Sequence, residues 1–183
     1  DRLLGSVVSD VDGNAEDRSD TVSVFNGPRP QILHCRDEAE ESKSVAAWVQ
    51  ARHDAGIPLE EIGIFVRDEA QLTRVRSALA TFGLAYYVLD ERVAPEPHFI
   101  AVCTMHLAKG LEFRAVVVMA CDDEIIPSQE RIAAVGDETD LREVYDTERH
   151  LLYVACTRAR EHLLVTGSGT VSEFLDDLND FRT

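Results

Sequence analysis

The feature that most constrains the fold of this 183-residue chain is a regular alternation of short apolar runs with helix-length stretches, which begins at residue 31. The apolar runs have the length of buried strands and lie at 31–35, 62–66, 86–89, 100–104, 115–120 and 162–166. Helices are predicted at 38–55, 69–82, 140–155 and 172–178. Strands that alternate with helices need crossover connections. The alternation therefore predicts an α/β fold, a mainly parallel sheet with helices on both faces.

The chain divides at about residue 30. Residues 1–29 are rich in charge and show no apolar period, so we expect an irregular acidic segment there. Residues 30–183 are long enough for one sizeable core and are predicted to form a single domain. The acidic stretch at 9–20 lacks the ligand spacing of a calcium loop, and no Cys/His cluster has zinc spacing, so no metal site is expected.

The charge balance excludes one large class of proteins. The chain carries 18 Lys and Arg against 34 Asp and Glu, a formal net charge of −16, which is unlike a bulk-basic nucleic-acid binder. No apolar run approaches the ~18–20 residues of a membrane span, and nothing at the N-terminus resembles a signal peptide. We therefore expect a cytoplasmic protein with no membrane partner. Its four cysteines lie among apolar neighbours and are predicted to be buried free thiols.

Several catalytic patterns are missing from the sequence. It contains neither the phosphate-binding pattern G-x-x-x-x-G-K-[ST] nor a complete G-x-G-x-x-G loop. The G-x-S-x-G elbow of hydrolases and the H-E-x-x-H pattern of zinc proteases are also absent. The chain is therefore predicted to do no chemistry alone.

Cationic side chains follow several predicted elements. Arg67 directly follows one strand, Lys109 lies a few residues beyond another, and Arg158 comes just after a helix. Because ligands of open parallel sheets bind beside the carboxyl ends of strands, we expect these positions to converge on one edge and face a phosphate group. Arginine suits this task, since its planar fork meets two phosphate oxygens at once. For any single arginine in so acidic a chain, an ion pair with a nearby carboxylate is the commoner alternative.

Three segments resemble motifs of one enzyme family. Residues 102–113 resemble motif V of the UvrD/Rep-type superfamily 1 DNA helicases, residues 147–160 resemble motif VI, and residues 64–74 resemble motif IV. The loop that follows motif V in this family is matched at 126–129. The resemblance runs from about residue 30 to residue 167. It implies the C-terminal, second RecA-like motor domain, a P-loop NTPase-type fold that here lacks its own phosphate loop.

The resemblance implies a nucleotide-facing role for five residues. Arg67 and Arg158 would be catalytic, as arginine fingers that reach the γ-phosphate of ATP from across a cleft. Glu112 would accept a hydrogen bond from the ribose, and Gly110 would allow close backbone approach. Lys109 would lie near the nucleotide or position this loop. ATP with Mg²⁺ would be held mainly by the N-terminal RecA-like domain of the same protein, so the chain alone would be inactive.

The resemblance also implies contact with single-stranded DNA. Thr104 and His106 stand where motif V of relatives borders the DNA strand. The whole protein would then be an ATP-dependent helicase or translocase, moving 3′ to 5′ in the bacterial cytoplasm in association with the nucleoid. Residues 83–100 leave no room for the domain that larger relatives insert, which predicts a compact version.

Two other interpretations remain open at this point. One is a stand-alone interaction module with a helicase-like fold and no ATPase, and the other is the helicase part of a helicase–nuclease. The motor interpretation requires Arg67 and Arg158 to meet at a shared rim. Their separation to opposite sides of the molecule, or a fixed internal ion pair at either one, would overturn it.

Overall fold

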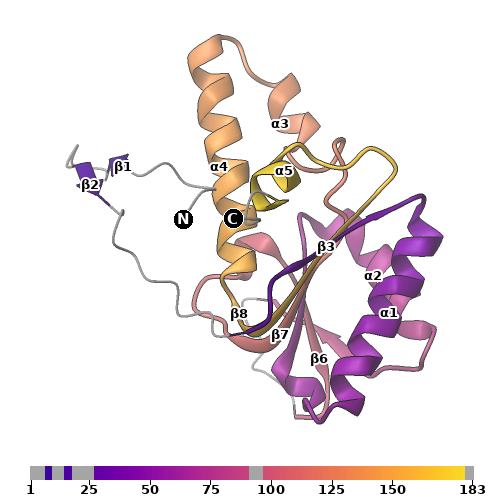
Figure 1. The fold of residues 1–183 in the computed structure, drawn as a ribbon. Coiled ribbons are helices and arrows are strands. Elements are labelled where there is room, and N and C mark those ends of the chain that lie inside the picture. Colours follow the sequence, from indigo (N-terminus) through magenta and orange to yellow (C-terminus); the bar gives the residue numbers. More distant parts are fainter. Residues whose placement is uncertain (1–6, 10–14, 18–26, 91–96, 180–183) are drawn as a thin grey trace.

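Six parallel strands form the centre of the molecule. The computed structural model describes residues 7–9, 15–17, 27–90 and 97–179, and the six strands follow the order β3-β8-β7-β4-β6-β5. Their bounds are Gln31–Cys35 (β3), Ile62–Val66 (β4), Tyr86–Val88 (β5), Ile100–Thr104 (β6), Phe113–Val118 (β7) and Ala159–Ser168 (β8). The predicted fold class is confirmed: a parallel sheet lies between two layers of helices (Figure 1).

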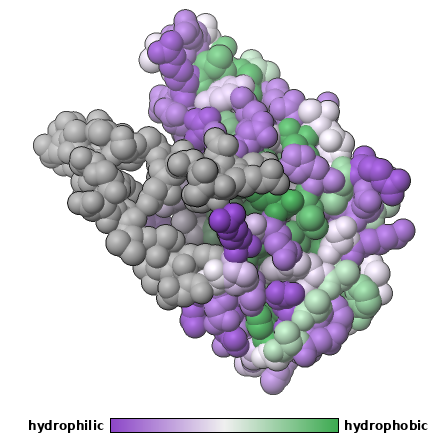
Figure 2. Space-filling model, in the orientation of Figure 1, coloured by the Kyte–Doolittle hydropathy of each residue, from purple (hydrophilic) through white to green (hydrophobic). Residues whose placement is uncertain are grey.

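The helices connect these strands on both faces of the sheet. Their bounds are Glu38–Asp54 (α1), Leu72–Ala80 (α2), Gln129–Ala133 (α3), Glu138–Cys156 (α4) and Phe174–Asn179 (α5), with short 3₁₀ turns at Leu59–Glu61 (η1), Glu69–Gln71 (η2) and Met105–Leu107 (η3). Helices α1 and α2 pack together on one face, and α4 and α5 cover the other (Figure 1). Hydrophilic residues dominate the periphery of the face drawn in Figure 2, and apolar residues show mainly toward its middle.

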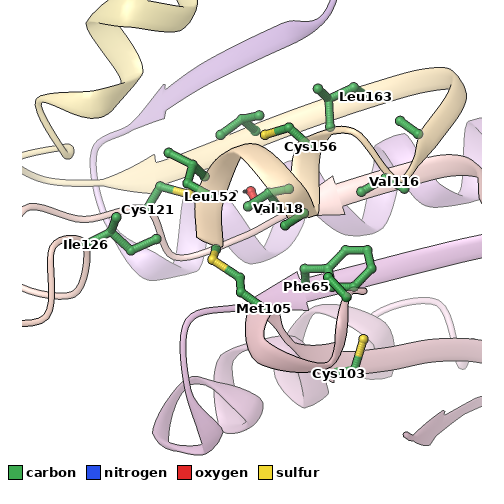
Figure 3. Packing of buried hydrophobic residues seen from close by; sticks show 14 of the residues in the cluster. Phe65, Cys103, Met105, Val116, Val118, Cys121, Ile126, Leu152, Cys156 and Leu163 are labelled. Atoms are coloured by element: carbon green, nitrogen blue, oxygen red, sulfur yellow. Dashed lines mark hydrogen bonds between the residues drawn. The ribbon is translucent and has the colours of Figure 1, made fainter. Parts of the chain in front are cut away.

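Alternate residues of each central strand supply the two halves of the core. In β4, Ile62 and Ile64 pack against α1 and α2, whereas Phe65 packs toward α4. Residues on successive positions of a strand point to opposite faces, so an uninterrupted apolar run is what a sheet buried on both sides requires. Figure 3 shows Leu152 and Cys156 of α4 facing the side chains of β7 and β8.

Helix α4 has clear local signals at both ends. The Asp137 side chain accepts hydrogen bonds from the backbone N–H groups of Thr139 and Asp140, which satisfies two otherwise unpaired donors of the first turn. The helix then runs through Cys156 with Thr157 as its C-terminal cap, and Arg158 connects it to β8. It therefore spans the full depth of the sheet, from the carboxyl ends of the strands to their amino ends.

The sequence predicted the positions of the helices and strands more accurately than the residues at which they begin and end. The predicted helix at 69–82 is divided into η2 and α2, and the strand predicted at 162–166 extends to the ten residues of β8. The polar segment at 127–140, predicted as a surface excursion, contains α3 and the first turn of α4. Within the segment 1–29, predicted to be irregular, β1 (Val7–Ser9) pairs antiparallel with β2 (Ala15–Asp17). None of the helices in the described ranges is both long enough and apolar enough to cross a membrane.

Candidate functional site

Arg158 lies at the amino end of the sheet, between α4 and β8. Its backbone carbonyl accepts a hydrogen bond from the N–H of Phe113 at 3.0 Å, which ties it to the start of β7. Its guanidinium donates to the carbonyl of Val154 at 3.0 Å, to the hydroxyl of Thr157 at 3.1 Å and to the carbonyl of Leu111 at 3.4 Å. All of these acceptors are neutral, and no carboxylate of the described residues forms an ion pair with Arg158.

The loop that leads into β7 lies beside Arg158. Lys109, Gly110 and Glu112 are all exposed, and the Leu111 carbonyl between them is the one that Arg158 contacts. Gly110 has a φ of +82°, a conformation that side-chain-bearing residues rarely adopt. No atom lies within 4 Å of the place where its Cβ would be, so this backbone is open to a partner. The structure thus brings Arg158 together with the three loop residues at one end of the sheet.

Arg67 has the opposite environment. It is 6% exposed and forms a two-pronged ion pair with Glu148 of α4, which is fully buried. The Arg67 Nε lies 2.5 Å from one carboxylate oxygen, and its second terminal nitrogen lies 2.6 Å from the other. A guanidinium held in this way has little freedom to reach a ligand. The predicted role of Arg67 as an arginine finger is therefore withdrawn.

The two arginines also lie at opposite ends of the sheet, so the predicted convergence is wrong. Arg67 follows the carboxyl end of β4, whereas Arg158 precedes the amino end of β8, and these strands run parallel. Strand register places Arg67 level with Ala120 and Arg158 level with Glu112, about 26 Å apart along the strand direction. The prediction placed all of these residues at the carboxyl ends of the strands. However, the connection from η3 to β7 runs back to the amino end of the sheet, where residues 109–112 lie beside Arg158.

The Glu148 carboxylate accepts hydrogen bonds from two further residues. Arg131 donates to it at 2.8 Å and the backbone N–H of Ser128 at 3.3 Å. Burial would raise the pKa of Glu148, but the hydrogen bond and charge of Arg67, together with the hydrogen bonds from Arg131 and Ser128, outweigh burial and lower that pKa. Glu148 and Arg131 were missed as site residues. The sequence did contain one indication: Glu148 lies four residues from both Val144 and Leu152, so it is on the apolar face of its helix.

Thr104 and His106 belong to this same carboxyl end. Thr104 is the last residue of β6, and His106 is an exposed residue of η3. The His106 Nε2 lies 3.0 Å from a terminal nitrogen of Arg67, which can only donate, so Nε2 accepts. Partial burial and the charge of Arg67 lower the pKa of His106. The seven predicted site residues therefore separate into an amino-end group (residues 109, 110, 112 and 158) and a carboxyl-end group (residues 67, 104 and 106).

A second buried polar cluster holds the other helix layer. Arg74 of α2 pairs with Glu41 of α1 and with Asp122, which follows β7. Glu41 is fully buried and also accepts from the Thr166 hydroxyl and from the Ala120 backbone N–H. This cluster fastens α1 and α2 to the ends of β7 and β8. Among the described residues, no group of three or more His, Cys, Asp or Glu side chains is arranged to hold a metal ion.

The fold and the grouping of these residues define a RecA-like α/β domain. Residues 90–169 match the model of the UvrD-like helicase C-terminal domain. The match does not depend on Arg67. The similarity to helicases therefore rests on the sequence match, whereas the buried ion pair of Arg67 and its distance from Arg158 contradict the predicted pair of converging arginines.

Individual relatives agree with this family. The chain is 31% identical over 132 residues to a putative ATP-dependent DNA helicase, YjcD, of Bacillus subtilis, and 37% identical over 83 residues to the helicase PcrA of Staphylococcus epidermidis. These matches cover 70% and 45% of the chain but only 17% and 11% of the two relatives. The C-terminal domain of a possible DNA helicase from Lactobacillus plantarum has a similar fold, with a TM-score of 0.60, 22% identity and 86% of each chain covered.

Proposed function

We propose that this chain is the second motor domain of an ATP-dependent DNA helicase, and that Arg158 is its arginine finger. The observation that carries the proposal is the position of Arg158, which lies beside an open glycine loop and, among the described residues, donates to neutral oxygens. The helicase relatives are described as ATP-dependent. Glu112 and Gly110 are proposed to face the ribose side of the nucleotide, with Lys109 positioning the loop.

The chemistry that Arg158 would serve is phosphoryl transfer to water. As the bond between the γ-phosphorus and the bridging oxygen breaks, negative charge spreads over the phosphate oxygens, and a guanidinium donating to them stabilises that charge. Hydrogen bonds to charged groups are worth about 1.5–3 kcal/mol, against about 0.5–1.5 for neutral ones. Arg158 therefore gains by exchanging carbonyl acceptors for a phosphate, whereas Arg67 already has a carboxylate.

The remaining parts of the reaction belong to a neighbouring domain in this proposal. The N-terminal RecA-like domain of the same protein would supply the phosphate loop, and Mg²⁺ bound there would neutralise the phosphates. This chain alone would hydrolyse no ATP. Single-stranded DNA would pass Thr104 and His106 at the carboxyl end, and the full-length protein, a nucleoid-associated cytoplasmic enzyme, would move along this strand from 3′ to 5′. Nucleotide and DNA would then lie at opposite ends of one sheet.

The test is an arginine replacement in the full-length protein. Arg158→Ala is expected to lower the ATPase kcat by roughly 10³–10⁵-fold while the nucleotide Kd changes only a few-fold, because a finger acts on the transition state. Steady-state hydrolysis and equilibrium binding of a fluorescent ATP analogue measure the two quantities. Arg160→Ala is the matched control, since Arg160 is an exposed arginine two residues away. Hydrolysis retained in the Arg158 variant would refute the finger role.

A further inference from the structure

The Glu148 carboxylate is the meeting point of several chain segments. It is fully buried midway along α4, and it accepts hydrogen bonds from both prongs of Arg67, from Arg131 and from the backbone of Ser128. These donors come from the end of β4, from α3 and from the loop before α3. Arg67 extends the cluster by donating from its remaining terminal nitrogen to His106 of η3. One carboxylate therefore fixes the carboxyl-end loops to α4.

The cluster has an unequal charge count. Two guanidinium groups surround one carboxylate, so one positive charge remains uncompensated within it. The side chain of Arg131 is 39% exposed, and His106 beside Arg67 is exposed as well. In a chain of net charge −16, this surplus is a local attraction for an anion at the proposed DNA end.

Helix α4 links this cluster to the other end of the sheet. From Glu148 the helix continues for eight residues to Cys156, about 12 Å along its axis, and Arg158 follows after the capping residue Thr157. Leu152 and Ala155 of this stretch are fully buried against the sheet, and Met105 of η3 lies in the same apolar cluster (Figure 3). From Glu148 to Cys156 one side of the helix is packed against the sheet, and the helix has no break in this stretch.

We propose that Glu148 is a positioning residue that couples the DNA-facing turn η3 to the helix that Arg158 follows. The inference rests on the proposed function and deepens it. Glu148 touches neither ligand; it holds Arg67, and through Arg67 it holds His106, at a fixed place on α4. An anion bound beside His106 then acts on the same rigid helix that ends two residues before the arginine finger. The single-stranded DNA that activates the ATPase is therefore sensed through this carboxylate.

The experiment compares two buried glutamates in the full-length protein. Glu148→Gln keeps the side-chain shape but removes the charge that holds Arg67, and Glu41→Gln makes the same change in the Arg74 cluster, which does not contact η3. Glu148→Gln is expected to reduce the stimulation of ATPase by a poly-dT oligonucleotide at least tenfold, with the KM for ATP changed less than twofold. Glu41→Gln is expected to lower the unfolding midpoint without reducing this stimulation.

A double replacement separates coupling from stability. Arg67→Met with Glu148→Met replaces the ion pair by apolar side chains, which restores packing without restoring a hold on His106. A recovered unfolding midpoint with stimulation still reduced supports the positioning role. The positioning role is overturned if the double variant recovers both the unfolding midpoint and the DNA stimulation of its ATPase. It is also overturned if Glu148→Gln has normal stimulation, or if Glu41→Gln loses as much stimulation as Glu148→Gln. A wild-type protein that hydrolyses no ATP would instead refute the proposed function, and the inference with it.

Discussion

Arg67 and Arg158 show how the surroundings of a residue decide its use. Both side chains carry the same permanent charge, yet Arg67 is paired with a buried carboxylate, and Arg158 is held by carbonyl and hydroxyl oxygens. Moving Arg67 away would leave the Glu148 charge buried and unpaired, which is strongly unfavourable. Moving Arg158 away costs only neutral hydrogen bonds. Only the second arginine is free to meet a ligand.

The ion pair at Glu148 predicts a specific response to acid. The pKa of Glu148 is lowered in the folded protein, so this group stabilises the fold above its unfolded pKa, about 4.3, and this stabilisation is lost as the pH falls toward the folded value. Glu148→Gln is expected to cost about 3–5 kcal/mol at pH 7, because Arg67 then lacks its counter-charge. In urea unfolding between pH 7 and pH 3, the free energy of unfolding should fall less for the variant than for the wild type. Parallel curves for the two proteins would contradict this explanation.

At the scale of elements, one glycine makes room for an aromatic ring on the central strands. Gly63 of β4 lies under the ring of Phe113 from β7, and a Cβ at Gly63 would be 2.5 Å from a ring carbon. The same ring packs edge-on against Phe65, with the ring centres 6.0 Å apart. The sequence predicted both strands, but a glycine inside an apolar run did not indicate which ring it accommodates.

Gly63→Ala should therefore destabilise the fold. The added methyl group forces the Phe113 ring away from its contact with Phe65, and overpacking of this kind costs about 1–3 kcal/mol. Equilibrium urea unfolding measures the change. Gly136→Ala is the control, because no atom lies within 4 Å of a Cβ there and the loop has room for it. Equal stability of the Gly63 variant and the wild type would show that the two strands separate easily.

At the scale of the whole molecule, the core excludes water from all four thiols. Cys35, Cys103, Cys121 and Cys156 are buried and free, as the sequence predicted. Burial raises the pKa of Cys103 and of Cys156 to about 12, so neither forms a reactive thiolate near neutral pH. The native protein is expected to react very slowly with a thiol reagent such as Ellman's reagent at pH 8. In 6 M guanidinium, all four thiols of the unfolded chain should react. Rapid reaction of several thiols in the native state would show that the core opens readily.

The sequence by itself determined the alternation of strands and helices, the two-sided burial of the sheet and the similarity to helicases. These properties depend on residues that are close together in the sequence: apolar runs, capping residues such as Asp137 and contiguous motifs. The tertiary structure decided which end of the sheet each functional residue occupies and which partner it has. The Arg67–Glu148 pair joins positions 81 residues apart, and no local pattern encodes such a contact. Crossover connections fix it, because they determine which loops share an end of the sheet.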